Sequence, residues 1–153
     1  WYNRNKLLSN YEYCTGGKNG YTPSAGKTLV TTAEKNNLRL TTVTLNDGNE
    51  YQTHEDLYEE TFNKYKRYKI IDKEQFQFTD SNIKGSLYIK ENFFYPLTEE
   101  ETENIRTLAQ IDPNIKKGKV GKITVFLEQE KLTEIPIYLK EEKKKSFFKW
   151  PWS

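Results

Sequence analysis

The sequence predicts an α+β fold in which an antiparallel hairpin and one helix precede a small all-β sandwich domain. Two β-branched runs, Lys27–Ala33 and Leu38–Leu45, indicate the hairpin, and the segment that follows them has helical spacing. From about residue 69, polar and apolar residues alternate between short turns, which is typical of strands. We therefore place a domain boundary near residues 67–70.

Three regions follow from this boundary. Residues 1–68 hold the hairpin and the helix, residues 69–140 form the predicted β-sandwich, and residues 141–153 form a tail. The tail has three consecutive lysines followed by two phenylalanines and two tryptophans, a composition that suits a membrane–water interface. A disordered tail is the alternative interpretation of the same residues.

The predicted hairpin has a turn signal at its tip and another after its second strand. Asn36 and Asn37 separate the two β-branched runs, and asparagine tolerates the positive φ that a tight hairpin turn needs. Asp47 and Gly48 then end the second run. Two or three strands and one helix can cover only one face of a sheet, so we expect a layer to be missing from this region.

The helix is predicted over residues 53–68. Thr53 is the expected N-cap, and Lys64, Lys66 and Arg67 favour the last turn because cations interact well with a helix C-terminus. The residues expected on the face that packs against the hairpin are Leu57, Tyr58, Thr61, Phe62 and Tyr65.

A second, shorter helical signal interrupts the β-rich region. Thr98 and Glu101 have the spacing of a capping box, in which each side chain bonds the backbone N–H of the other residue. We therefore expect a short helix or turn there.

Composition excludes several classes of function. The net charge of +2, from 24 basic and 22 acidic residues, does not indicate nucleic acid as a partner. A single cysteine excludes an internal disulfide, and a single histidine excludes a zinc site built from several histidines. No apolar run is long enough for a transmembrane helix, and no signal peptide is visible. Because the sequence begins with Trp1 and has no methionine, we expect a processed chain or a piece of a longer one.

The stretch before the hairpin carries the most specific pattern in the chain. It resembles the serine-type D-alanyl-D-alanine carboxypeptidases, the low-molecular-mass penicillin-binding proteins. Their pattern is an Asn-Lys-Leu-Leu segment, a Gly-x-Lys-Thr-Gly-x-Thr strand, then Ala-Gly and a β-hairpin. The matching residues, in order and spacing, are Asn5 to Leu8, Gly17, Lys18, Gly20, Thr22, Ala25 and Gly26. A Lys-x-Gly triplet alone would be a weak signal, whereas the forty-residue run is a strong one.

The resemblance implies a substrate-binding strand made of Lys18, Asn19, Gly20 and Thr22. Lys18 would supply a positive charge for the carboxylate of a peptide that ends in D-Ala. Gly20 would keep the backbone bare so that an extended peptide can approach the strand edge. Asn19 stands where the family has threonine. Its amide can donate a hydrogen bond, but its reach and shape differ.

The resemblance also implies partners and a location. The substrate would be a peptidoglycan stem peptide ending in D-Ala-D-Ala, and β-lactams would bind the complete enzyme without any cofactor. Such an enzyme works outside the cytoplasm, at the bacterial cell membrane and wall, where it affects cell shape. The tail would be the beginning of the family's membrane anchor, or a short version of it.

No residue of this chain is assigned as the nucleophile. The family nucleophile lies in a Ser-x-x-Lys motif at a helix N-terminus, which puts serine and lysine on one face. Ser24 and Lys27 fit the spacing, but Ser24 follows a proline and reads as part of a turn; Ser81 and Lys84 fit it between two predicted strands. The chain is therefore interpreted as the C-terminal portion of an enzyme that needs its N-terminal part and is inactive alone.

The same sequence also contains residues that are typical of other functions. Cys14 and His54 could form a nucleophile pair, but Cys14 is expected in a strand and His54 in the first helical turn, so a structural role is favoured. The glutamates at 59–60 and 99–101 are more typical of solvated faces than of acid/base pairs. A non-catalytic module that binds cell wall or protein is the main alternative, and binding of single-stranded nucleic acid is disfavoured by the balanced charge.

Overall fold

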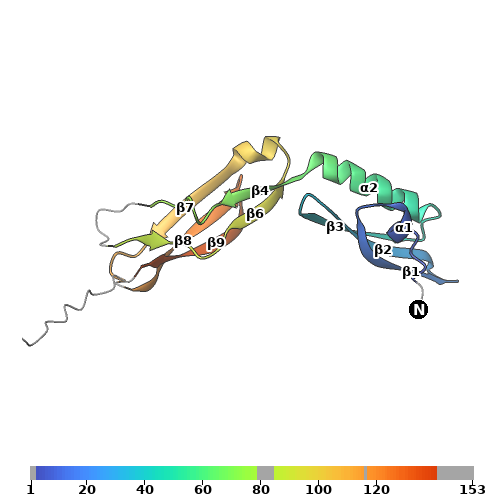
Figure 1. Cartoon of the computed structure of the whole chain (residues 1–153), viewed down its shortest axis with the longest axis horizontal. Coiled ribbons are helices and arrows are strands. Elements are labelled where there is room, and N and C mark those ends of the chain that lie inside the picture. Colours follow the sequence, from blue (N-terminus) through green and yellow to red (C-terminus); the bar gives the residue numbers. More distant parts are fainter. Residues whose placement is uncertain (1–2, 79–84, 116, 141–153) are drawn as a thin grey trace, which may run out of the picture. The chain divides into compact units, whose positions relative to one another are not determined.

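The computed structural model describes residues 3–78, 85–115 and 117–140 and is built mostly of antiparallel strands with few helices (Figure 1). The predicted α+β class is confirmed. The molecule separates into two compact units. Each unit has its own hydrophobic core.

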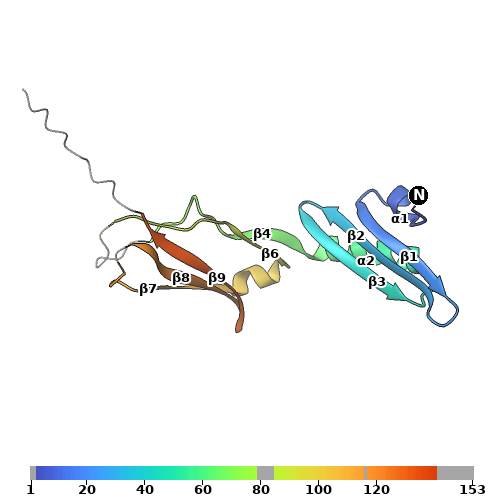
Figure 2. The same cartoon turned by 90° about the horizontal axis from the view of Figure 1, so that it is seen from below.

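Unit 1 comprises residues 1–68 together with residues 94–103. Three of its strands form an antiparallel sheet in the order β1-β2-β3, seen side by side in Figure 2. Its elements are α1 (Leu7–Asn10), β1 (Cys14–Thr22), β2 (Gly26–Lys35), β3 (Leu38–Leu45) and α2 (Glu50–Lys64).

The predicted hairpin is confirmed, with β2 and β3 paired along most of their lengths. Asn36 and Asn37 connect them with φ angles of 52° and 63°. Positive φ at both central residues is what a type I′ turn requires, and this turn matches the right-handed twist of the two strands.

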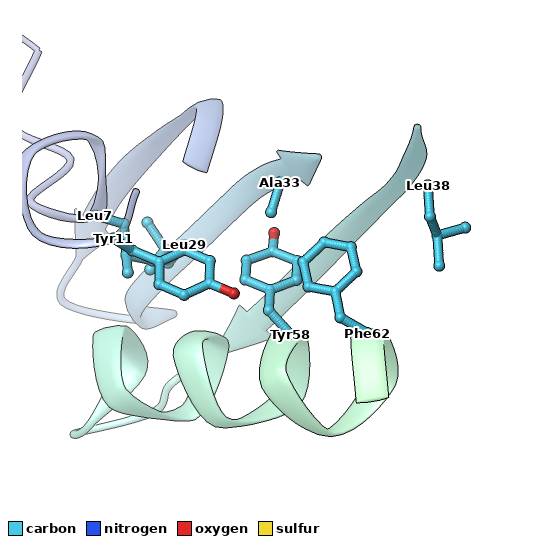
Figure 3. Packing of buried hydrophobic residues seen from close by; sticks show 7 residues of the cluster. All are labelled: Leu7, Tyr11, Leu29, Ala33, Leu38, Tyr58 and Phe62. Carbon is cyan, nitrogen blue, oxygen red and sulfur yellow. The ribbon is translucent and has the colours of Figure 1, made fainter. Parts of the chain in front are cut away.

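The core of unit 1 lies between α2 and one face of the sheet. Figure 3 shows Tyr58 and Phe62 of α2 pointing toward Ala33 of β2, while Tyr11 stacks on Tyr58 with ring centroids 5.8 Å apart. The complete cluster is Leu7, Tyr11, Leu29, Ala33, Leu38, Tyr58 and Phe62. Large aromatic rings therefore supply much of the buried apolar surface.

Helix α2 begins and ends earlier than predicted, at Glu50 and Lys64 rather than at residues 53 and 68. The Asp47 carboxylate accepts a hydrogen bond of 2.8 Å from the N–H of Asn49, so the turn leads directly into the helix. Thr53 is not the N-cap, because its own N–H already bonds the Asn49 carbonyl oxygen at 3.1 Å. Tyr65 is extended, and the next residues belong to β4 (Lys66–Ile71).

The buried face of α2 also differs from the prediction. Leu57, expected to pack on the sheet, is 42% exposed. The buried residues recur at every fourth position: Glu50, His54, Tyr58 and Phe62. This stripe runs along one face of the helix. It was not predicted because the two residues in its N-terminal half are polar, so that they do not contribute to an apolar periodicity.

Unit 2 comprises residues 69–93 and 104–153. It holds a four-stranded antiparallel sheet in the order β5-β9-β8-β7, and elsewhere β4 pairs with β6 (Phe93–Leu97). The four strands are β5 (Leu87–Tyr88), β7 (Ile105–Ile111), β8 (Gly118–Leu127) and β9 (Glu130–Leu139).

The core of unit 2 lies on one face of this sheet. Ile123 of β8 and Ile135 of β9 are partners in register, and both are buried. Ile70, Ile71 and Phe93 from the other two strands pack against this cluster. Two layers of strands around one apolar core are the sandwich that the alternating pattern predicted.

The capping box is confirmed, and it precedes a short 3-10 helix, η1 (Glu100–Asn104). The Thr98 N–H donates to Glu101 Oε2 at 2.8 Å, and the Glu101 N–H donates to Thr98 Oγ1 at 3.2 Å. These reciprocal bonds satisfy two backbone donors that a helix start leaves free.

Candidate functional site

All four predicted binding residues lie on strand β1. This strand pairs with β2 on one side, and no strand of the described residues pairs with its other edge. Because side chains alternate between the two faces of a strand, Lys18, Gly20 and Thr22 share one face and Asn19 lies on the other. The structure thus brings three of the four residues together on a single face.

Lys18 lies on the face of the sheet that α2 does not cover. It is paired in register with Val30, and Val30 with Val43, so the three side chains form a row across the sheet. The Lys18 side chain is exposed, and its Nζ donates a 2.7 Å hydrogen bond to the backbone carbonyl oxygen of Asn19. Among the described residues, no acidic side chain forms an ion pair with Lys18.

Asn19 lies on the α2 side of the sheet, opposite the buried Leu29. Its Oδ1 atom is buried and has no hydrogen-bond partner among the described residues. A buried acceptor without a donor is costly, so a partner is expected at this position.

Gly20 and Thr22 shape the end of the strand. Gly20 is opposite Thr28, and a Cβ atom on Gly20 would lie 2.9 Å from Thr28 Oγ1. Thr22 Oγ1 accepts a 3.1 Å hydrogen bond from the Ala25 N–H and lies 3.4 Å from Ser24 Oγ. The Thr22 hydroxyl therefore stabilises the turn between β1 and β2 in this structure.

Two asparagines near α1 hold the start of β1, a role that sequence reasoning did not assign. Asn3 Nδ2 donates to the Gly17 carbonyl oxygen at 3.0 Å, and Asn5 Nδ2 donates to that of Gly16 at 3.4 Å. Asn5 is buried, and its Oδ1 also accepts a bond of 3.1 Å from the Leu7 N–H. The Asn-Lys-Leu-Leu segment therefore fixes β1 directly. The available signal was an Asn-x-Asn pattern just before two leucines.

Position 17 requires a glycine. Its φ is +128°, and a Cβ atom would lie 2.2 Å from the Val30 carbonyl oxygen and 2.7 Å from Thr31 Cα. Only glycine tolerates both the conformation and this close approach of two strands. The residue before Lys18 is thus packed against the backbone of β2.

The face that carries Lys18 exposes apolar side chains, as the prediction of a missing layer requires. Val30 is 40% exposed, Val43 57% and Leu45 73%. Val30 and Val43 are neighbours across the sheet, and Leu45 pairs with Thr28 one row further along. Exposed apolar side chains that are neighbours on one face are typical of a surface that contacts another part of a protein or a partner.

His54 is fully buried in α2 and bonded through both ring nitrogens. Nδ1 lies 2.7 Å from Thr31 Oγ1 and Nε2 lies 3.0 Å from Thr44 Oγ1, so the ring bridges β2 and β3. Burial lowers the pKa of His54 below its usual value, although nearby Asp47 and Glu50 act in the opposite direction. Cys14 Sγ instead lies 3.5 Å from the Gly16 carbonyl oxygen. These partners give both groups structural roles.

One of the two Ser-x-x-Lys matches, Ser24 with Lys27, lies within the described residues. Ser24 lies in the turn between β1 and β2 rather than on a helix, and Lys27 Nζ lies 3.2 Å from Glu50 Oε2. The second match, Ser81 with Lys84, lies outside the described residues, as does the tail at 141–153.

Comparison with protein families assigns both parts of the chain. Residues 1–49 match the D-alanyl-D-alanine carboxypeptidase family, and residues 60–145 match the C-terminal domain of penicillin-binding protein 5. The two matches together place the chain in the class of the penicillin-binding proteins. The second match covers more than half of the chain, which therefore belongs to the family of the penicillin-binding protein 5 C-terminal domain.

Solved structures share this fold. The D-alanyl-D-alanine carboxypeptidase DacD from Francisella tularensis is 21% identical with a TM-score of 0.62, over 90% of this chain and 38% of that one. Penicillin binding protein 5 from Haemophilus influenzae is 19% identical with a TM-score of 0.64, over 89% and 44%. A peptidoglycan synthesis regulatory factor (PBP3) from Streptococcus pneumoniae is 18% identical with a TM-score of 0.59, over 92% and 45%. The chain thus spans less than half of each structure. No curated protein matches it.

Proposed function

We propose that this chain forms part of a D-alanyl-D-alanine carboxypeptidase that removes the terminal D-Ala from peptidoglycan stem peptides. The observation that carries the proposal is the exposed ammonium group of Lys18, which lies on an edge strand without an acidic partner among the described residues. A free carboxylate is the ligand such a cation binds best. The open edge of β1 offers backbone groups to an extended peptide, so one strand supplies both contacts.

The reaction is acyl transfer through a serine. The serine attacks the peptide bond between the two D-Ala residues, terminal D-Ala leaves, and water hydrolyses the acyl-enzyme. Lys18 binds the carboxylate of the terminal residue and so orients the scissile bond, while Gly20 leaves room for the peptide backbone. A β-lactam would occupy the same place and trap the serine.

In this proposal the nucleophile belongs to the N-terminal part of the same enzyme, outside this chain. Support comes from Ser24, which lies in a turn, and from the apolar face of the sheet that Val30, Val43 and Leu45 expose beside Lys18. A second structural layer on this face would bury those side chains and bring a serine to the side of the sheet that holds Lys18.

We propose an extracytoplasmic location because the substrate is part of the cell wall. The 141–153 tail, with its lysines and aromatic residues, is proposed to contact the membrane surface. Within the described residues, no helix is both long enough and apolar enough to cross a bilayer.

The test is covalent labelling with a fluorescent penicillin, read on a denaturing gel, for this chain and for the complete protein from its native source. We expect label on the complete protein and none at 18.2 kDa. A labelled band at 18.2 kDa would show that a serine of this chain is the nucleophile. Absence of label on both would favour the alternative, a binding module that keeps the fold without the reaction.

A further inference from the structure

A buried polar cluster lies directly behind the start of the Lys18 strand. The hydroxyl oxygen of Thr31 is 2.7 Å from His54 Nδ1 and 2.7 Å from the hydroxyl oxygen of Tyr58. All three residues have no exposed surface. Buried polar groups weaken a core unless they are satisfied, and here each finds a partner within the cluster.

This cluster fixes the position of one residue of β2 relative to α2. Thr31 receives both contacts from the helix, and His54 also reaches Thr44 of β3 at 3.0 Å. Apolar packing alone is not directional, whereas two hydrogen bonds of this length hold the Thr31 side chain within narrow limits. The sheet is therefore positioned on the helix at Thr31.

The same residue is in contact with the motif strand. Thr31 is the register partner of Gly17, and a Cβ atom on Gly17 would lie only 2.7 Å from Thr31 Cα. Because Gly17 has no side chain to absorb a change, any shift of the Thr31 backbone moves Gly17 and the adjacent Lys18. Asn3 and Asn5 hold the carbonyl groups at this point, so the strand is fixed from two directions.

We propose that Thr31, His54 and Tyr58 are positioning residues that set the place of Gly17 and Lys18 in the substrate site. The proposal rests on the function proposed above for Lys18. In this proposal, His54 acts through Thr31 on the position of Lys18, which lies on the opposite face of the sheet. Neither the burial of His54 nor the family pattern indicates this role.

The experiment compares the second-order rate constant for acylation by a fluorescent penicillin in the complete enzyme. Thr31→Val and His54→Gln are expected to lower it about tenfold, because small displacements of a binding group reduce rates steeply. Thr61→Val is the matched control: it also removes a hydroxyl, one bonded to the Leu57 carbonyl oxygen at 2.7 Å on α2 and outside the cluster. It is expected to change the rate constant less than about twofold.

A second pair of variants separates positioning from stability. The amide of asparagine ends about where Nδ1 of histidine lies, and that of glutamine about where Nε2 lies. His54→Asn should therefore keep the contact to Thr31 and most of the rate, whereas His54→Gln keeps only the contact to Thr44. Melting temperatures are measured for both. If the rate constants follow the melting temperatures instead of the Thr31 contact, the role is merely structural and the proposal is wrong.

If the wild-type enzyme is not acylated, the proposed function is contradicted, and the positioning role then needs a measurement that does not depend on the reaction. The amide ¹H–¹⁵N signals of Gly17 and Lys18 in this chain are recorded for the wild type, Thr31→Val and Thr61→Val. We expect both signals to shift in Thr31→Val and to stay in place in Thr61→Val. Unchanged Gly17 and Lys18 signals in Thr31→Val would overturn the inference.

Discussion

Lys18 is the residue on which the proposed function depends most directly. Its ammonium group is exposed and, among the described residues, bonds only to the Asn19 carbonyl oxygen. We expect Lys18→Ala in the complete enzyme to lower kcat/KM at least about tenfold, the effect of one charged contact in a site. Lys119→Ala is the control, because it removes an exposed lysine from unit 2. Unchanged kinetics for Lys18→Ala would remove this residue from the site.

His54 predicts how stability depends on pH. Burial lowers its pKa in the folded chain below the usual value of 6.5, so the unfolded chain binds a proton more readily. The stabilisation from neutral His54 is therefore complete above about pH 6.5 and is lost as the pH falls through the folded-state pKa. We expect the melting temperature of the wild-type chain to decrease between about pH 7 and pH 5.

The control for this pH dependence is His54→Asn, which cannot take up the proton. Its melting temperature should vary less over the same interval, and the remaining slope reports on carboxylates such as Asp47, whose pKa is lowered by hydrogen bonds from Thr53 and Asn49. Equal slopes in the two proteins would show that His54 does not contribute.

At the scale of single residues, the sequence predicts a binding role for the series Lys18 to Thr22 because its spacing is specific, and this role stays a prediction. The sequence missed contacts that depend on packing. The hydrogen bonds from the buried His54 to Thr31 and Thr44 could not be predicted, because the three residues are apart in the chain and meet only when α2 lies on the sheet. The burial of Asn19 Oδ1 likewise depends on tertiary contacts.

At the scale of elements, the Asn36–Asn37 turn offers a direct test of local conformation. Both residues have positive φ, which a β-branched side chain adopts only with strain. Asn37→Val is expected to lower the free energy of unfolding by about 1–2 kcal/mol, whereas Asn37→Gly should be tolerated. Denaturant unfolding followed by circular dichroism measures both. Equal losses in the two variants would contradict the type I′ assignment.

The hairpin and the capping box were predictable because both are local. Each signal is contained in at most four consecutive residues: Asn36 and Asn37 form the turn of the hairpin. Thr98 and Glu101 form the capping box. The limits of α2 were not predictable in the same way. The helix begins at Glu50 because of the turn made by Asp47. Of the basic residues expected in its last turn, Lys64 is there, whereas Lys66 and Arg67 belong to β4.

At the scale of the whole molecule, the apolar face of the β1–β3 sheet is where this chain would differ from the complete enzyme proposed above. Val43 is 57% exposed here but is expected to be buried once the missing layer is present. Val43→Thr keeps the β-branched shape and adds a hydroxyl group. In the isolated chain it should change the free energy of unfolding by less than about 0.5 kcal/mol. In the complete enzyme, an unsatisfied buried hydroxyl should cost about 1–3 kcal/mol.

Thermal or denaturant unfolding of both proteins checks this difference. Lys119→Ala, an exposed change in unit 2, should have small effects in both proteins. A similar effect of Val43→Thr in the two proteins would show that no layer covers this face.

The hydrogen bond from Lys18 to the carbonyl oxygen of its own neighbour would prepare the proposed site for its ligand. An ammonium group has three N–H donors, so the bond of 2.7 Å to Asn19 leaves two of them for a carboxylate. In the proposed enzyme the carboxylate would bind without displacing that bond, and the Lys18 side chain would lose less rotational freedom on binding because it is already held.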